Sequence, residues 1–210
     1  MGRRNEHSQE QQREMALTAA ELLVVREGIA GFSMRKVAKA IGYTVGNLYL
    51  LFSSQDDLLA SINERTADAI YAFLQAASEP LKEPRARLRA MGAGYIEFAQ
   101  RHPHRWRLMF EHQLPPKMKP RPSVDLRLKR LFELVEENLR PLMPAARPDR
   151  LRSTAAALWS SVHGVCSLAV TDKLKWSGLS DYRPLSKLVV ETFLDGLRES
   201  GHPAPRRRAG

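Results

Sequence analysis

The chain has 210 residues but only one cysteine, Cys166. A single cysteine excludes an internal disulfide framework and a zinc site built from a Cys-x-x-Cys motif. The first residues, MGRRNEHSQEQQREM, carry arginines without an apolar stretch behind them, so they lack the pattern of an export signal. We therefore expect a cytoplasmic protein.

Long hydrophobic runs are also missing. The most apolar stretch, AAALWSSVHGVCSLAV at residues 155–170, is interrupted by serines and a histidine. It is shorter than the roughly 18 residues that indicate a membrane-spanning helix. The stretch therefore predicts a buried helix, and we expect no membrane partner.

Motifs of catalysis and metal binding are absent from the sequence. It contains no G-x-S-x-G, no P-loop, no H-E-x-x-H and no glycine-rich dinucleotide motif after a strand. His102, His104, His112, His163 and Cys166 do not have the spacing of metal ligands. We expect a protein that is not an enzyme, with no catalytic residue, metal or cofactor.

Charged residues are unevenly distributed. The net charge is +10, and a basic protein can bind a polyanion. Residues 80–130 hold 13 basic and 4 acidic side chains, whereas residues 53–79 hold 1 and 5. The basic stretch is either a solvated surface or a site for an anionic effector, for instance an acyl-coenzyme A with its phosphates on Arg101, Arg105 or Arg107.

No stretch of the sequence shows the sustained alternation of a β-strand, and apolar residues recur at helical spacing almost everywhere. With glycines and prolines as breaks, the pattern predicts an all-α protein of about nine helices, near residues 10–28, 33–41, 44–52, 54–77, 85–101, 104–113, 123–140, 149–173 and 184–199. The apolar face of the first helix is expected to hold Met15, Ala16, Ala19, Leu22 and Leu23.

Residues 33–52, SMRKVAKAIGYTVGNLYLLF, predict two short helices joined by a turn. Ser33 has the side chain of a helix N-cap, and Gly42 can adopt the left-handed conformation that ends the first helix. Thr44 can cap the second helix, which Leu48 and Phe52 anchor at a spacing of four residues. The arrangement is that of a helix-turn-helix.

The front of the second short helix is suited to contact DNA. Free N–H groups at a helix start favour a phosphate, and Gly46 has no side chain to keep the backbone away. Thr44, Val45 and Asn47 can then face base edges, and Tyr49 can offer its hydroxyl to a phosphate. Similar helix pairs also occur in all-α proteins that bind no DNA.

The longer stretch SMRKVAKAIGYTVGNLYLLFSSQDDLL resembles the DNA-binding head of the TetR family of bacterial repressors. The matching positions are Ser33, Val37, Ala38, Ile41, Gly42, Thr44, Gly46, Leu48, Tyr49, Phe52, Asp57 and Leu58. The resemblance and the helix geometry together select as DNA-binding residues Ser33, Arg35, Lys36, Thr44, Val45, Gly46, Asn47, Tyr49 and Gln55.

Two positions depart from the family pattern. Many members have His or Tyr where Leu51 stands, and a phosphate-binding Lys where Gln55 stands. Both departures weaken phosphate contacts, which position a protein on DNA. Arg3, Arg4 and Arg13 can compensate if an N-terminal arm enters the minor groove, although arginines near a free terminus are more often merely solvated.

The last two predicted helices indicate a dimer. The helix near 149–173 carries apolar residues on two faces, so it needs two partners, its own core and a second subunit. The resemblance implies dimerisation through a four-helix bundle of these helices. The expected interface comprises Leu158, Val162, Val165, Leu188, Val189, Thr192, Phe193, Gly196 and Leu197.

Trp159, His163 and Gly164 resemble the Trp-His-Gly signature of the C-terminal domain in one TetR subgroup. On one reading, Trp159 and His163 are ordinary interior residues. On the other, they line an effector pocket together with Trp106, Met109, Phe110, Leu128 and Phe132.

We therefore expect a helix-turn-helix domain at 1–53, a helical effector-binding and dimerisation domain at 54–200, and a basic tail at 201–210. The expected partners are double-stranded operator DNA, a second copy of the chain and a small, largely apolar effector, for which an acyl-CoA and a fatty acid are examples. The expected function is that of a one-component repressor released from a palindromic operator. Two alternatives are a sequence-tolerant DNA-compacting protein and a helical interaction protein without DNA binding.

Overall fold

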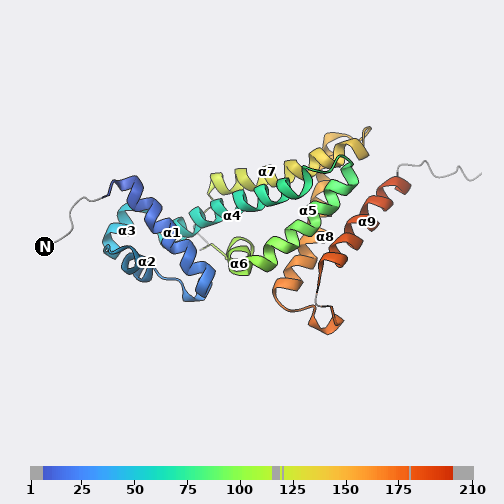
Figure 1. Cartoon of the computed structure of the whole chain (residues 1–210). Helices are drawn as coiled ribbons and strands as arrows, with labels where there is room; N and C mark the ends of the chain where they lie inside the picture. The colour runs from blue at the N-terminus through green and yellow to red at the C-terminus, as the bar shows by residue number, and fades with distance from the viewer. Residues whose placement is uncertain (1–6, 115–118, 120, 180, 201–210) are drawn as a thin grey trace, which may run out of the picture. The chain divides into compact units, whose positions relative to one another are not determined.

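The computed structural model describes residues 7–114, 119, 121–179 and 181–200 (Figure 1). Arg3, Arg4 and the basic tail at 201–210 lie outside the described residues. Within the described part, the chain forms α-helices and short 3-10 turns and no strand, which confirms the all-α prediction. The helices are α1 Gln9–Glu27, α2 Met34–Ile41, α3 Val45–Leu51, α4 Gln55–Ser78, α5 Pro84–Arg101, α6 Pro103–Glu111, α7 Pro122–Leu139, α8 Pro148–Val170 and α9 Arg183–Ser200.

Prolines set the starts of four helices. Pro84, Pro103, Pro122 and Pro148 are the first residues of α5, α6, α7 and α8. Proline suits this position because its fixed φ is helical and the missing N–H would have no partner there. For this reason the sequence locates these helices well, and each predicted start lies one residue after the observed one.

The chain packs as two compact units. One, the head unit, comprises residues 1–71 and 101–130, and the other, the cavity unit, comprises residues 72–100 and 131–210. The helices α4 and α7 each contribute to both units. These units are defined by packing, whereas the expected boundary after residue 53 separates two functions, and that boundary stays a prediction.

The core of the head unit forms around α1, which contacts α2, α3 and α6. The expected apolar face of α1 is wrong in part, because Leu22 is 64% exposed. Leu17, Ala20 and Val24 are buried instead. A helix with several packing partners buries a wider arc than one stripe, and the positions of those partners decide which residues lie within it.

The caps of the helix-turn-helix are confirmed. The Ser33 hydroxyl accepts a hydrogen bond from the Lys36 N–H at 3.2 Å, and the Thr44 hydroxyl accepts one from the Asn47 N–H at 3.2 Å. Gly42 ends α2 in the left-handed conformation, with φ at 73° and ψ at 23°. These local bonds fix where α2 stops and α3 begins.

In the cavity unit, α8 packs against α9, and Gly92 of α5 lies close to α9. A Cβ atom at Gly92 would lie 2.9 Å from the Ser186 Oγ and 3.0 Å from the Val190 Cγ2. The first distance is shorter than real Cβ contacts and the second is tighter than most of them, so the glycine permits this approach of α5 and α9.

Candidate nucleic-acid interface and internal cavity

The short helix α3 is anchored on one side and exposed on the other. Leu48 is completely buried and Phe52 is 1% exposed, as the four-residue spacing predicts. Thr44 and Gly46 are exposed, and Tyr49 is 52% exposed. Thr44, Gly46 and Tyr49 are therefore available to a large partner such as duplex DNA, whereas the predicted contact residue Val45 is half-buried against the head core.

Leu50 was not among the predicted contact residues, although it is 77% exposed on α3. It lies two residues from both Leu48 and Phe52, so their inward orientation places it outward. This spacing could have identified it from the sequence. An exposed leucine on a reading helix can contact the methyl group of thymine.

Asn47 is half-buried and borders a groove between the start of α1 and α3, which His7, Gln12 and Leu50 also line. Its Oδ1 atom is buried and has no hydrogen-bond partner among the described residues. A paired contact to adenine uses both the oxygen and the nitrogen of the amide. Because the oxygen is buried in this conformation, a paired contact to adenine requires the side chain to rotate.

The cations of α2 differ in their surroundings. Arg35 is exposed. The Lys36 Nζ forms an ion pair with the Glu27 Oε2 at 2.6 Å and donates to the Gly31 carbonyl at 2.8 Å. Hydrogen bonds from Lys36 and then Arg26 lower the pKa of the Glu27 carboxyl. A phosphate contact by Lys36 would therefore compete with Glu27, whereas Arg35 is exposed to solvent.

Arg13 does not compensate for the weakened phosphate contacts in this structure, because it is directed inward. Its Nη1 donates to the Leu51 carbonyl at 2.6 Å, and its guanidinium lies 4.2 Å from the centre of the Phe52 ring. The last carbonyls of a helix lack partners within the helix and favour a cation. Arg13 therefore stabilises the end of α3, and the expectation of a DNA contact is corrected.

The start of α4 is held by hydrogen bonds and ion pairs. The Ser54 hydroxyl accepts from the Asp57 N–H at 3.0 Å, and the Asp57 carboxylate accepts from the Ser53 N–H at 2.9 Å. Arg121 pairs with Asp57 and, at 2.8 Å, with Glu64. These contacts fix the first turns of α4 directly after α3. Gln55, the predicted contact residue at this start, is exposed.

Part of the basic excess of residues 80–130 pairs with acidic residues of α1 and α4. Arg105 pairs with Glu21 at 3.0 Å, and Arg127 pairs with Asp68 at 2.8 Å. Because Arg105 is only 13% exposed at its side chain and already paired, it is poorly suited to hold the phosphates of an effector.

Asp57 and Glu64 make the stability of the head unit depend on pH. Partial burial alone raises the pKa of each carboxyl, but hydrogen bonds from Ser53 and Arg121 to Asp57, and from Ser123 and Arg121 to Glu64, outweigh it and lower both. The pKa of each carboxyl is lower in the folded protein than its ordinary value, which is 3.8 for Asp57 and 4.5 for Glu64. The ionised carboxylates therefore stabilise the fold at pH values above these ordinary values, and this stabilisation is lost as the pH falls through the pKa values of the folded protein.

We expect the urea midpoint to fall between about pH 6 and about pH 3, and to fall less in the Arg121→Gln variant, which lacks the cation for both carboxylates. Arg147→Gln removes an ion pair with Asp149 in which both side chains are exposed and which does not involve Asp57 or Glu64, and it serves as the control. If the urea midpoint falls by the same amount in the wild type and in the Arg121→Gln variant, Arg121 is not the cause of the pH dependence.

Three residues of the predicted effector pocket lie together in the cavity unit. The ring of Trp159 lies 5.1 Å from that of Phe132 and stacks on the imidazole of His163 at 4.5 Å, measured between ring centres. The His163 Nδ1 is 2.9 Å from the Tyr95 hydroxyl, and the two are hydrogen-bonded. The imidazole of His163 is half-buried and already hydrogen-bonded, which favours the simpler reading of this residue as structural.

The other four predicted pocket residues, Trp106, Met109, Phe110 and Leu128, belong to the head unit. Trp106 is fully buried there, and its ring centre lies 5.1 Å from that of Phe110. The sequence missed Tyr95, which is 4% exposed. The small residues beside it in MGAGYIEF mark a closely packed helix face and are the available signal.

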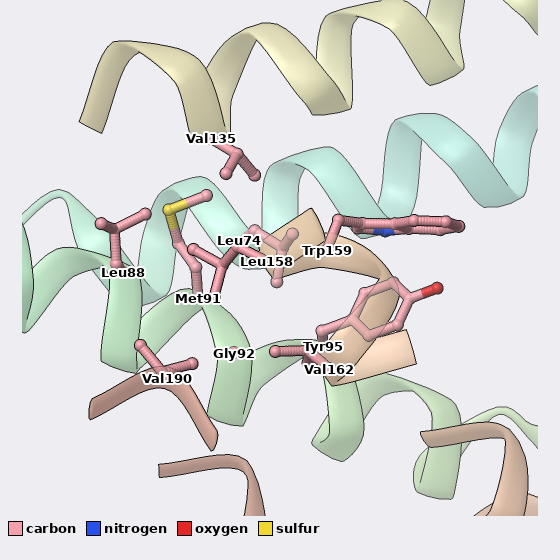
Figure 2. Close-up of a pocket in the computed structure, with 10 residues that line it drawn as sticks. All are labelled: Leu74, Leu88, Met91, Gly92, Tyr95, Val135, Leu158, Trp159, Val162 and Val190. Carbon is pink, nitrogen blue, oxygen red and sulfur yellow. The ribbon is translucent and has the colours of Figure 1, made fainter. Parts of the chain in front are cut away.

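The cavity unit contains a cavity whose walls are almost entirely apolar (Figure 2). Tyr95 of α5 and Trp159 of α8 form one end, and Leu88, Met91 and Val190 form the other. Leu74 of α4, Val135 of α7, Gly92 of α5, and Leu158 and Val162 of α8 complete the lining. Of the seven predicted pocket residues, only Trp159 lines this cavity.

The residues of the predicted dimer interface differ in exposure: some are buried in their own unit, and others are exposed. Leu158 and Val162 are 4% and 5% exposed and line the cavity of their own unit, so the structure does not place them on an exposed face. Leu188 is 60% exposed. Thr192 and Gly196 are also exposed, whereas Val165, Val189, Phe193 and Leu197 are half-buried.

An apolar face on α8 and α9 is therefore left uncovered by the residues that the structure describes, and we call it the α8/α9 face. It comprises Gly164, Val165, Leu168, Leu188, Val189, Thr192 and Gly196. Leu168, which the sequence did not single out, is 42% exposed. No described atom lies within 4 Å of a Cβ built on Gly164 or Gly196, so a second helix can approach closely there.

Neither a membrane span nor a metal cluster is found in the described part of the chain. No helix within the described ranges is both long and apolar enough to cross a membrane. Among the residues with described positions, no three His, Cys, Asp or Glu side chains are grouped so that they could hold a metal ion.

Models of two protein families match the chain. One, described as bacterial regulatory proteins of the tetR family, matches residues 16–62. The other, described as the tetracyclin repressor-like C-terminal domain, matches residues 88–193, about half of the chain. The first match includes the whole helix-turn-helix, and the second includes most residues of the cavity and of the α8/α9 face.

Individual proteins are similar as well. The nucleoid occlusion factor SlmA of Yersinia enterocolitica is 28% identical over 148 residues, which are 70% of this chain and 72% of that protein. A protein of unknown function from Rhodococcus sp. RHA1 has a TM-score of 0.75 at 22% identity, covering 93% of this chain and 98% of its own. PfmR, a TetR family transcriptional regulator from Thermus thermophilus, has a TM-score of 0.59 at 18% identity, and the match covers 86% of this chain and 97% of PfmR.

Proposed function

The chain belongs to the TetR family of bacterial regulatory proteins, and on that premise we propose that it acts as a dimeric repressor. In this proposal, α3 of each subunit enters the major groove of a palindromic operator. A small, largely apolar effector in the cavity releases the protein from DNA. The family accounts for DNA binding and transcription regulation, and the finer steps are our proposal.

The observation that carries the DNA-binding mode is the two-sidedness of α3. Leu48 and Phe52 hold the helix on the head core, whereas Gly46, Tyr49 and Leu50 remain exposed. A helix of this kind can place its N-terminal residues on base edges while the preceding helix crosses the backbone. A two-fold dimer would present two such helices about 34–36 Å apart, one turn of the duplex.

Selection of bound sequences from a random duplex pool tests this mode. A repressor that reads an operator should return a palindrome with two half-sites. A DNA-compacting protein should return a featureless pool, and a helical interaction protein should return nothing. The DNA-compacting alternative has one observation in its favour, since several relatives at 23–28% identity are named nucleoid occlusion factors.

The substitution Tyr49→Phe is expected to weaken operator binding by about 1–2 kcal/mol, the scale of a hydrogen bond to a charged group. Tyr49 is half exposed on α3, so loss of its hydroxyl should leave the fold intact. Titration of the selected operator measures the effect. Tyr71→Phe, on α4, is the matched control, and unchanged affinity of Tyr49→Phe removes this contact from the proposal.

The cavity supports the effector step. It lies among α4, α5, α7, α8 and α9, and α4 is a continuous helix that carries Leu74 in the cavity wall and Asp57 near the end of α3. A ligand that favours one arrangement of these helices can shift the protein away from its DNA-binding form. Moving it from mostly bound to mostly free needs a differential affinity of about 5.5 kcal/mol.

The sequence suggested a fatty acid or an acyl-CoA as effector, with phosphates on Arg101, Arg105 or Arg107. These arginines belong to the head unit, whereas the cavity belongs to the other compact unit, and Arg105 is paired with Glu21. The apolar lining of the cavity supports the expectation that the effector is largely apolar. Because the lining is almost entirely apolar, it also limits which kinds of ligand can bind in the cavity.

A further inference from the structure

We propose that the cavity takes a compact, uncharged aromatic ring and discriminates against anions of the same size. This inference rests on the proposed function in one respect, because it assigns a ligand class to the cavity that we propose as the effector site. Three properties of the cavity wall carry it: its lack of charge, its few hydrogen-bonding groups and its shape.

The wall of the cavity has no charged side chain among its described residues. None of the residues that line it is an aspartate, glutamate, lysine, arginine or histidine. An ionised carboxylate or phosphate that entered would lose its hydration without gaining a counter-charge, and this cost is large in an apolar site. The wall therefore excludes fatty acids and acyl-CoA by their charged ends and accepts uncharged molecules.

Hydrogen-bonding groups are few in the wall. Tyr95 carries the principal polar group of the lining, and its hydroxyl already bonds to the His163 Nδ1 at 2.9 Å. Figure 2 shows this hydroxyl at the far edge of the ring, beyond the aliphatic residues of the cavity. Burial lowers the pKa of His163, so the imidazole that faces Tyr95 is neutral near pH 7. A ligand with few hydrogen-bonding groups therefore loses little on entry.

The shape of the cavity suits a flat ring. The rings of Tyr95 and Trp159 lie 6.4 Å apart at 65°, so they form an aromatic corner at one end of the cavity. A ligand ring in that corner can make edge-to-face contacts with one of them. The Met91 sulfur, toward the other end, can contact the edge of the same ring. The cavity has a volume of about 40 Å³, so a compact ligand fits better than a long one, and even a single ring requires the lining side chains to move apart. Apolar cavities in other proteins are known to bind benzene.

Direct binding tests the class with a matched pair of probes. Toluene and benzoate share the ring and differ in charge, and octanoate represents a fatty acid. Titration calorimetry on the full chain without DNA is expected to show saturable binding of toluene and at least about tenfold weaker binding of benzoate and octanoate. Binding of either anion as tight as that of toluene, or no binding of toluene, overturns the proposal.

Fluorescence of Trp159 gives a readout located at the cavity. Trp176 is 84% exposed, so a Trp176→Phe background removes its signal at little cost to the fold. The remaining emission comes from Trp159 at the cavity and from Trp106, which is buried in the head unit. Toluene should change the emission with the affinity found by calorimetry in the Trp176→Phe background, and the change should disappear when Trp159 is also replaced by Phe. A change that does not saturate, or that appears equally with benzoate, contradicts binding in the aromatic corner.

Variants show whether the cavity is the site. Val135→Phe places a ring in the cavity and is expected to reduce toluene affinity at least about tenfold, at a stability cost typical of overpacking. Val25→Phe, at a position on α1 that is 48% exposed, is the matched control and should bind toluene like wild type. If Val135→Phe does not fold, Val162→Leu fills the same space with fewer atoms and should reduce affinity by a smaller factor.

Tyr95→Phe separates an apolar site from one that uses the hydroxyl. The proposal expects this variant to retain toluene affinity within about threefold, because the ring stays and only the bond to His163 is lost. Loss of toluene binding in Tyr95→Phe, with an unchanged melting temperature, overturns it. Operator release is measured separately with toluene. Binding without release supports the ligand class and contradicts only the effector role.

Discussion

Leu188→Glu is expected to convert the protein from a dimer to a monomer and to lower operator affinity at least about 100-fold. Leu188 is 60% exposed on α9 and lies on the α8/α9 face, whose glycines leave room for a second helix. In a two-fold interface the substitution appears twice, so two carboxylates would be buried without partners. A monomer contacts only one half-site and loses the contribution of the second head.

Analytical ultracentrifugation measures the change of mass, and titration of the selected operator measures the change of affinity. Leu126→Glu is the matched control, because Leu126 is 66% exposed on α7 and is not part of the α8/α9 face. This control should remain dimeric and bind the operator normally. A dimeric Leu188→Glu variant would show that another surface joins the subunits, and the assignment of the α8/α9 face would then fail.

The sequence predicted the last two helices, but it could not tell which face of each packs in its own unit and which stays exposed. When a helix is apolar on two sides, the sequence does not show which side packs against its own unit until the neighbouring helices are known. The Leu158 and Val162 stripe faces the interior because α5 and α9 approach it there, where Gly92 and Val190 line the same cavity. The uncovered face continues instead through Val165 and its neighbours.

The sequence predicted helix caps and turns better than side-chain contacts between residues that are far apart in the chain. Ser33, Gly42 and Thr44 act within a few residues of their own positions, so their cap and turn roles can be read from the sequence. The inward path of Arg13 could not be predicted, because its acceptor, the Leu51 carbonyl, is 38 residues away. Tyr95 was missed for a similar reason, since its partner His163 lies on another helix.

Leu48→Ala is expected to cost about 2–5 kcal/mol of stability and to abolish tight operator binding. Leu48 is completely buried, and α3 has only seven residues, too few to be stable without packing. Removing the side chain leaves a cavity below the reading helix, so the front of α3 loses its fixed orientation. Urea unfolding measures the stability, and hydrogen exchange of the α3 amides shows whether the loss is local.

Leu50→Ala, two residues away on the same helix, separates packing from recognition. Leu50 is 77% exposed, so its truncation should change stability by less than about 0.5 kcal/mol. If Leu50 contacts a thymine methyl, operator binding should weaken by about 1 kcal/mol, and repeated selection should lose a preference at one base pair of each half-site. If instead Leu50→Ala unfolds α3 while Leu48→Ala does not, then α3 is packed by its other face, and Thr44, Gly46 and Tyr49 would be directed away from the DNA.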